Sequence, residues 1–81
     1  LSIEPMLGDV AVWLENSTYS PDWLIVGAMT GPGSKDHQPQ REWVENLVRY
    51  ARENNIPLFM KGNLKAVWGD DLIQEYPPEL L

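Results

Sequence analysis

Polar side chains able to bind a charged ligand follow three short apolar segments of the sequence. The carboxylate of Glu4 follows the first segment, the glycine-containing loop 27–33 follows the second, and Lys61 and Asn63 follow the third. A carboxylate, an ammonium group and an amide at one place can hold a polar or phosphate-bearing ligand through charge-assisted hydrogen bonds. The alternative is that these positions are polar only because the ends of the segments meet solvent.

The loop that begins at Gly27 is a candidate anion-binding loop. Glycines allow close approach of the backbone, and backbone N–H groups can surround an anion. The stretch Gly27–Ser34 matches neither GxGxxG nor GxxxxGK[ST], and the next predicted helix begins several residues later. The spacing therefore favours a flexible connection, with an anion-binding loop at Gly31–Ser34 as the weaker alternative.

The sequence assigns no metal site and no catalytic residue. It contains no cysteine and a single histidine, His37. This composition excludes disulfides, iron–sulfur ligation and cysteine-type zinc sites within the chain. His37 stands beside Asp36 in a loop, where a solvated histidine is the simpler interpretation. No particular serine is positioned against His37, so a Ser–His–Asp arrangement is not indicated.

The three apolar segments predict strands of a parallel sheet. They comprise residues 1–5, 23–28 and 56–60. Pro5 ends the first strand because it cannot donate a ladder hydrogen bond. The second segment is apolar throughout, which is typical of a parallel strand covered on both faces. In parallel α/β folds the loops at the carboxyl ends of the strands hold ligands, so we expect Glu4, the 27–33 loop and residues 61–63 at one edge.

An amphipathic helix is predicted over residues 40–53. Its apolar side chains form one stripe, which comprises Trp43, Val44, Leu47, Val48 and Ala51. Oppositely charged residues four positions apart support the same helix on its polar side. Elsewhere the pattern predicts an irregular connection with one helical turn over residues 6–14, a turn of helix over 64–68 and a short helix over 70–75 that Pro77 and Pro78 end.

The predicted order of elements is β–(connection)–β–α–β. It indicates an α/β fold with a small parallel sheet of about three strands and one main helix packed on one face. A chain of 81 residues is a single small domain at most, and a domain of this size has a marginal core that usually needs external support. Leu1 lies in a strand-like segment, so we expect residues 1–81 to be a fragment of something longer. The expected partners are the remainder of that parent and, with strand edges exposed, further copies of the chain.

The charge and hydropathy of the chain exclude several classes of function. The net charge is −6, which argues against a general nucleic-acid binder, because such a protein needs a basic face. No apolar run approaches the roughly 18 residues that span a bilayer, and no signal peptide is recognisable. We therefore expect a cytoplasmic protein with neither a membrane nor a nucleic acid as its partner.

Four short motifs occur along the chain in a familiar order: Leu1–Gly8, Trp23–Ala28, Thr30–Gly33 and Pro57–Lys61. Together they resemble the C-terminal portion of the phage Gp37/Gp68-like proteins, a family that looks like a radical-SAM-type partial TIM barrel. The resemblance implies that the chain is about the last third of a (β/α) barrel. Family members carry an N-terminal cysteine cluster that would hold an iron–sulfur cluster. The parent would therefore use that cluster and S-adenosylmethionine, whereas this chain holds no cofactor by itself.

The resemblance also implies positions for a binding site. Glu4, Gly27, Thr30 and Lys61 would face the mouth of the parent barrel, with Asn63 close by, and would contact S-adenosylmethionine or substrate. Two departures from the family pattern matter. Met29 stands where many relatives have an acidic residue, and Gly62 stands where relatives often have Asp or Gln. Because Met29 replaces the acidic residue, a catalytic role that the family assigns to this position is less readily expected in this chain.

Two classes of function remain open at this point. In the first, the chain is a segment of a radical-SAM-like enzyme that contributes rim residues but is not catalytic alone. In the second, it is a non-enzymatic protein-interaction module in which exposed Trp13 and Trp68 form a docking surface.

Overall fold

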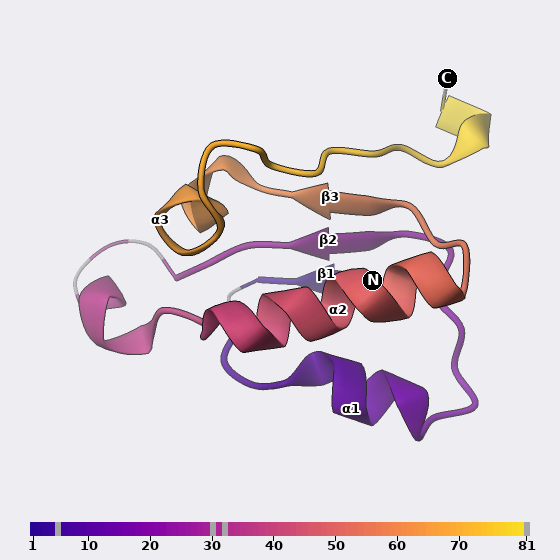
Figure 1. The fold of residues 1–81 in the computed structure, drawn as a ribbon, viewed down its shortest axis with the longest axis horizontal. Helices are drawn as coiled ribbons and strands as arrows, with labels where there is room; N and C mark the ends of the chain where they lie inside the picture. Colours follow the sequence, from indigo (N-terminus) through magenta and orange to yellow (C-terminus); the bar gives the residue numbers. More distant parts are fainter. Residues whose placement is uncertain (5, 30, 32, 81) are drawn as a thin grey trace.

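A three-stranded parallel sheet lies at the centre of the fold (Figure 1). A computed structural model describes residues 1–4, 6–29, 31 and 33–80. The strands are β1 (Ser2–Ile3), β2 (Leu24–Val26) and β3 (Leu58–Met60), in the order β1-β2-β3, and both pairs are parallel. The predicted α/β class with a small parallel sheet of about three strands is confirmed.

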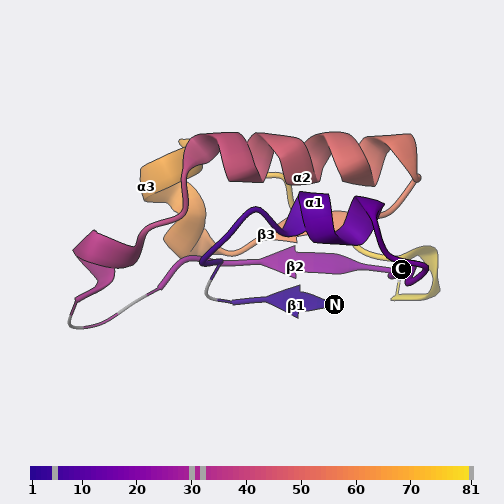
Figure 2. The ribbon, with the colours of Figure 1, turned by 90° about the horizontal axis from the view of Figure 1, so that it is seen from below.

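Two helices cover the same face of the sheet, as Figure 2 shows. Helix α1 (Val10–Glu15) connects β1 to β2, and α2 (Arg41–Glu53) connects β2 to β3. The predicted long helix is confirmed. The 6–14 connection was predicted to be irregular with one helical turn, and α1 is that helical part, in which Ala11 and Leu14 are buried at helical spacing.

Shorter helical segments occupy the loops. They are η1 (Ser34–His37), η2 (Gly62–Leu64), α3 (Lys65–Trp68) and η3 (Pro78–Leu80). In the described part of the chain, no helix has the length and apolar character needed to cross a bilayer.

The core lies between the sheet and the two helices. Its buried members are Ile3, Met6, Ala11, Leu14, Leu24, Val26, Ala28, Val44, Leu47, Tyr50, Ala51, Ile56, Leu58, Met60 and Leu64. The apolar stripe of α2 is rotated from the predicted one. Val44, Leu47 and Ala51 are buried as predicted and Tyr50 is buried with them, whereas Trp43 and Val48 are only partly buried.

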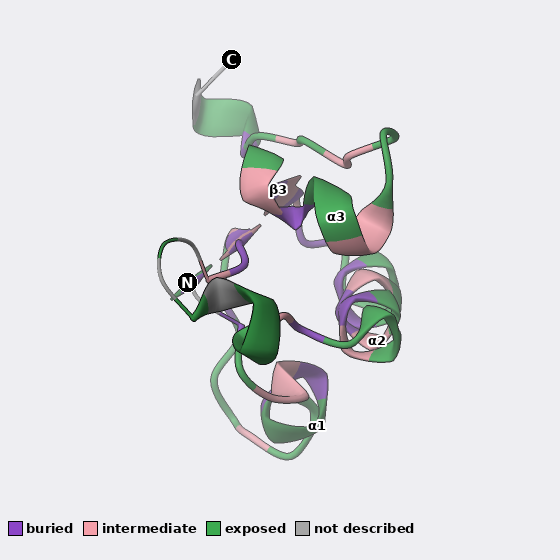
Figure 3. Ribbon diagram, turned by 90° about the vertical axis from the view of Figure 1, so that its left-hand side faces the viewer, coloured by how far each residue is buried: buried purple, intermediate pink, exposed green. Residues whose placement is uncertain are grey.

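The opposite face of the sheet has no helix over it among the described residues (Figure 3). Ser2, Ile25 and Phe59 lie side by side on this face in the strand register, and they are exposed or only partly buried. Phe59 packs against Trp23 and Tyr76, with ring centroids 6.5 Å and 5.4 Å away. The continuous apolar pattern of β2 thus reflects one helix-covered face and one face partly covered by aromatic rings.

The prediction of a helix over residues 70–75 is wrong. The chain is extended there and runs antiparallel to the outer edge of β3, with Phe59 opposite Gln74. Met60 N donates to Ile73 O at 2.7 Å, and Glu75 N donates to Leu58 O at 2.8 Å. An isolated six-residue helix is marginal in water. The extended segment instead satisfies backbone groups of β3 that would otherwise lack partners.

An ion pair between Arg52 and Glu75 connects this extended segment to α2. Arg52 donates to both carboxylate oxygens of Glu75, at 2.9 Å and 3.0 Å. Glu75 Oε1 also accepts a hydrogen bond from Leu58 N at 3.1 Å. The hydrogen bonds from Arg52, with a smaller contribution from Leu58 N–H, hold the pKa of Glu75 below its ordinary value. The pair therefore joins α2, β3 and residues 73–75.

The lowered pKa of Glu75 predicts a loss of stability in acid. The unfolded chain takes up a proton at Glu75 at a higher pH than the folded chain does, so the pair stabilises the fold above the ordinary pKa of 4.5 and this contribution is lost as the pH falls below it. We expect Glu75→Gln to lower the melting temperature at pH 7 and the difference from the wild type to shrink below pH 4.5.

The measurement is thermal unfolding by circular dichroism between pH 3 and pH 7, at low salt. Because the side chains of Arg52 and Glu75 are 49% and 40% exposed, the difference should be small. Glu79→Gln is the control, since the described residues show no ion pair for Glu79. A difference between Glu75→Gln and the wild type that stays constant with pH would contradict this account.

Candidate functional site

The carboxyl ends of the three strands bring four of the predicted site residues together. Glu4 follows β1, Gly27 follows β2, and Lys61 and Asn63 follow β3; we call these four residues the rim cluster. Lys61 Nζ donates to Glu4 Oε1 at 3.1 Å, and Asn63 Nδ2 lies 3.4 Å from Glu4 Oε2. The predicted convergence at one edge is therefore present. Thr30, the fifth predicted residue, lies outside the described residues.

Backbone hydrogen bonds fix the positions of the rim cluster. The sheet ladder continues past the strands, since Gly27 N donates to Ile3 O and Lys61 N donates to Val26 O, both at 2.9 Å. Met6 N donates to Gly27 O at 2.9 Å, which ties the chain after Glu4 to the end of β2. The side chains of the cluster thus project from a hydrogen-bonded backbone.

Asn63 extends the sheet with its side chain. Its Oδ1 accepts from Ala28 N at 2.9 Å, and its Nδ2 donates to Ala28 O at 3.0 Å. These two bonds orient the amide, and the same Nδ2 is directed toward Glu4. The sequence predicted Asn63 at this edge of the sheet, as a candidate binding residue close to Lys61. Its pairing with Ala28 has no signature in the sequence, because it depends on a contact between residues 35 positions apart.

Gly27 provides space for the carboxylate of Glu4. A Cβ atom at position 27 would lie 2.5 Å from Glu4 Oε2 and 3.1 Å from Asn63 Oδ1. Any larger residue would therefore displace the carboxylate. The glycine at this position is explained by the close approach of a side chain rather than by an anion-binding loop.

The ion pair of the rim cluster is accessible to solvent. The side chains of Lys61 and Glu4 are 43% and 33% exposed. An ion pair at this exposure contributes about 0–1 kcal/mol to stability. The ion pair therefore positions the two charged groups but is weak enough for either group to bind another partner.

In the described part of the loop after β2, the backbone conformation explains the two further glycines. Gly31 and Gly33 have φ of +88° and +82°, the left-handed region that favours glycine. His37 is exposed in η1. Among residues 1–4, 6–29, 31 and 33–80, no three His, Cys, Asp or Glu side chains are grouped so that they could hold a metal ion.

Two surface hollows lie near the ends of the sheet. One, of about 330 Å³, is on the carboxyl side and is lined by Leu7, Asp36, His37, Gln38, Gln40 and Trp43. The other, of about 360 Å³, includes Ile56, Pro57 and Glu75 and therefore lies at the amino ends of the strands. Ligands of parallel α/β folds bind at the carboxyl ends, so the larger hollow is the weaker candidate.

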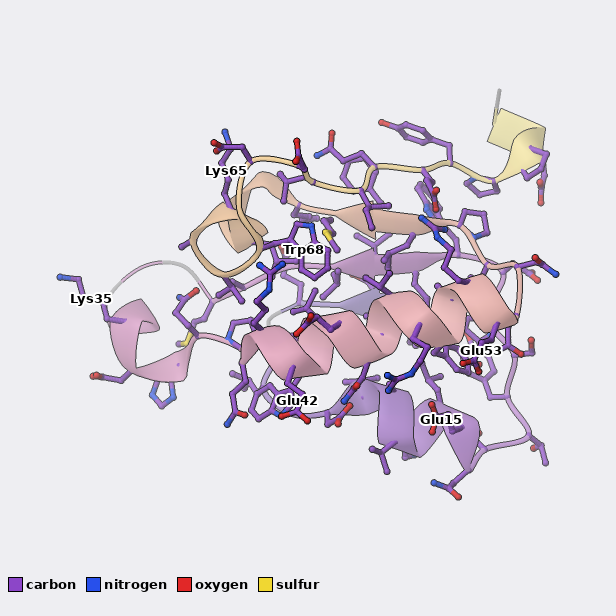
Figure 4. All side chains as sticks on the ribbon, viewed as in Figure 1. Glu15, Lys35, Glu42, Glu53, Lys65 and Trp68 are labelled. Atoms are coloured by element: carbon purple, nitrogen blue, oxygen red, sulfur yellow. The ribbon has the colours of Figure 1, made fainter. Side chains whose placement is uncertain are left out.

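Trp68 does not form the exposed surface that the sequence suggested. It is partly buried against the core and lies between α3 and α2 (Figure 4). The guanidinium of Arg41 lies 4.6 Å from the centroid of its ring and donates to Trp68 O at 2.8 Å. Trp13, by contrast, is 58% exposed on α1.

The fold and the rim cluster define an α/β protein whose polar residues gather at the carboxyl edge of a parallel sheet. The chain belongs to DUF5131, a family of proteins of unknown function, whose model matches residues 1–74. The match includes all three strands and the whole rim cluster. No curated protein and no solved structure shows significant similarity to the chain.

The close approach at Gly27 predicts a variant that alters the site but keeps the fold. In Gly27→Ala the new methyl group would push the Glu4 carboxylate away. Because that carboxylate is the end of a flexible side chain, stability should change by less than about 1 kcal/mol. We expect large changes in the side-chain NMR signals of Lys61 and Asn63.

Gly62→Ala is the matched control, since a Cβ atom at Gly62 would meet no atom within 4 Å. Urea unfolding measures stability, and ¹H–¹⁵N and ¹H–¹³C spectra report on the side chains. Unchanged Lys61 and Asn63 signals in folded Gly27→Ala would show that Glu4 does not lie against Gly27.

Proposed function

We propose that this chain is the C-terminal part of a radical-SAM-like (β/α) barrel and that its rim cluster binds S-adenosylmethionine or the substrate of the parent enzyme. The observation that carries the proposal is the contact of Glu4 with Lys61 and Asn63 at the carboxyl edge of the sheet. The resemblance of four motifs to the phage Gp37/Gp68-like proteins supports the same assignment. The rim cluster alone is not a catalytic site.

The cluster fits S-adenosylmethionine chemically. Glu4 is an acceptor for the N–H and O–H groups of the cofactor, and Lys61 and Asn63 are donors for its oxygen atoms. Gly27 leaves room for the Glu4 carboxylate at the end of β2, where a Cβ atom would displace it. When bound, the cofactor supplies the radical chemistry, and the residues of this chain position it.

An iron–sulfur cluster does not fit this chain. Its ligands in proteins are cysteine thiolates, and the 81 residues contain no cysteine. The proposal therefore assigns the cluster to another part of the parent. The role of residues 1–81 is to bind and orient a ligand.

The two edges of the sheet differ in a way that supports a larger parent. Residues 73–75 satisfy the outward backbone groups of β3. On β1, Leu1 and Ile3 bond to β2, so the backbone groups of Ser2 are directed to the outer edge. Further strands of a parent barrel would pair at β1, next to Glu4, and would complete the site from that side.

The proposal predicts binding of S-adenosylmethionine by the isolated chain. Titration into ¹⁵N-labelled protein should shift the amide signals of Glu4, Gly27, Lys61 and Asn63. Lys61→Met should weaken these shifts, whereas Lys65→Met should not, because Lys65 lies on α3 and pairs with Asp70 at 3.8 Å. Saturating cofactor without any shift at the rim cluster would contradict cofactor binding by this chain.

We propose a protein-interaction module as the second candidate function, because exposed apolar side chains gather on and near α1. Val12 and Trp13 are 53% and 58% exposed, and Trp13 contacts Tyr19 with ring centroids 6.5 Å apart. Tyr19, just after α1, is also 47% exposed. Patches of this kind often mark protein–protein contacts.

The second candidate predicts self-association through α1. Light scattering after size exclusion should show concentration-dependent dimers that Trp13→Gln removes. Tyr76→Gln is the control, since Tyr76 is 49% exposed near the opposite edge of the sheet. A wild-type chain that stays monomeric up to about 1 mM would exclude association stronger than about 4 kcal/mol.

A further inference from the structure

We propose that a hollow between α1 and α2 binds a primary alkylammonium group, which the carboxylates of Glu15 and Glu53 and the hydroxyl of Tyr50 hold. The hollow has a volume of about 270 Å³. It is lined by the end of α1, by residues 17–20 of the following loop and by the end of α2. No residue of a strand or of the rim cluster lines it, so the inference is independent of the proposed function.

The hydroxyl group of Tyr50 is the observation that first suggests a ligand. Tyr50 is only 6% exposed and belongs to the core, yet its hydroxyl forms no hydrogen bond within the described residues. Hydroxyl groups of buried tyrosines usually have a hydrogen-bond partner. In the described part of the chain, the only fully buried side-chain oxygen or nitrogen without a partner is Oδ1 of Asp9. The Tyr50 hydroxyl therefore reaches the surface, and Tyr50 lines the hollow there.

Two unpaired carboxylates give the hollow a negative charge. Glu15 is the last residue of α1 and Glu53 is the last residue of α2. Both line the hollow, and Figure 4 shows them on the two neighbouring helices. Among the described residues neither carboxylate takes part in an ion pair or a hydrogen bond. Both are therefore available to a cation in the hollow.

The arginines near the end of α2 do not neutralise this charge, because they have other partners. Arg49 donates to Asn46 Oδ1 at 2.7 Å, and Arg52 donates to both carboxylate oxygens of Glu75. The carbonyl groups in the last turn of a helix add a partial negative charge, and α2 is a helix of 13 residues. The end of α2 and the two carboxylates thus attract a cation together.

The available groups favour an ammonium ion over a metal ion. A calcium ion takes about six to eight oxygen ligands in proteins, but the described residues contain no group of three His, Cys, Asp or Glu side chains that could hold a metal. An ammonium group has three N–H donors. Glu15, Glu53 and Tyr50 supply one acceptor for each of them.

Apolar side chains in the hollow suit a short alkyl chain. Leu14 is 2% exposed, and the rings of Tyr19 and Tyr50 also line the hollow. The face of a tyrosine ring attracts a cation as well. Because small-molecule sites usually have volumes of about 300–1,000 Å³, this hollow suits a small ligand. The alkylammonium group can come from a free amine or from the end of a lysine side chain.

Titration of the ¹⁵N-labelled chain with n-butylammonium chloride, at constant ionic strength, tests the inference. We expect saturable shifts of the amide signals of Thr18, Tyr19 and Asn54 and no change at Gly27 or Asn63 of the rim region. Butan-1-ol keeps the alkyl chain without the charge, and butanoate carries the opposite charge, so neither should shift these signals. No shift with n-butylammonium, or equal shifts with butan-1-ol, would overturn the inference.

Two charge variants test the carboxylates. Glu53→Gln and Glu15→Gln should each weaken n-butylammonium binding about tenfold, since each removes one charge-assisted hydrogen bond. Glu42→Gln is the matched control, because Glu42 lies at the other end of α2 (Figure 4). Unchanged affinity in both Glu53→Gln and Glu15→Gln would overturn the site.

Tyr50→Phe tests the hydroxyl, because it removes that group and keeps the buried ring. Binding of n-butylammonium should weaken about fivefold, the loss of one hydrogen bond. Tyr76→Phe is the control, since Tyr76 is 49% exposed and does not line this hollow. A Tyr50→Phe chain that is well folded by its amide spectrum and binds as tightly as the wild type would overturn the role of Tyr50.

A lysine derivative separates the two sources of the ammonium group. Nα-acetyl-lysine N-methylamide carries the same group on a peptide unit. Affinity equal to or higher than that of n-butylammonium would support a lysine side chain of a polypeptide as the ligand, and lower affinity would support a free amine. Binding of neither probe would overturn the inference and leave cofactor binding at the rim cluster standing.

Discussion

Parallel pairing of three very short strands is the constraint on which the rest of this structure depends. Strands β1, β2 and β3 contribute only two or three residues each, so burial of their apolar side chains against α1 and α2 must supply most of the stability. Parallel pairing also places all three carboxyl ends at one edge. The rim cluster is a consequence of that pairing, since Lys61 and Glu4 are 57 residues apart in the sequence.

Two ion pairs of this chain serve different purposes. The carboxylate of Glu75 accepts from a backbone N–H as well as from Arg52, so breaking that pair also disturbs the edge of β3. Among the described residues, the charged groups of Glu4 and Lys61 form side-chain hydrogen bonds only with each other and with Asn63. No strand edge depends on it. It is therefore the pair that can exchange partners, and it lies where parallel α/β folds bind ligands.

The sequence was informative where one local pattern decides the structure. The stripe of α2 and the apolar runs of β2 and β3 predicted those elements and, through them, the shared edge with Glu4 and Lys61. Residues 70–75 were predicted wrongly, because their charged and apolar residues suit a short helix. The edge of β3, which lies far away in the sequence, offers these residues backbone partners that a short helix lacks.

The sequence by itself determined the order of the three strands and the main helix, the α/β class and the end of the sheet at which polar residues gather. These properties follow from local periodicity and from the rule that parallel strands share their carboxyl edge. Tertiary structure alone decided that Asn63 pairs with Ala28, that Gly27 makes room for a carboxylate and that residues 73–75 close one edge of the sheet. Each of these depends on distances of a few ångströms between distant residues, which no local pattern encodes.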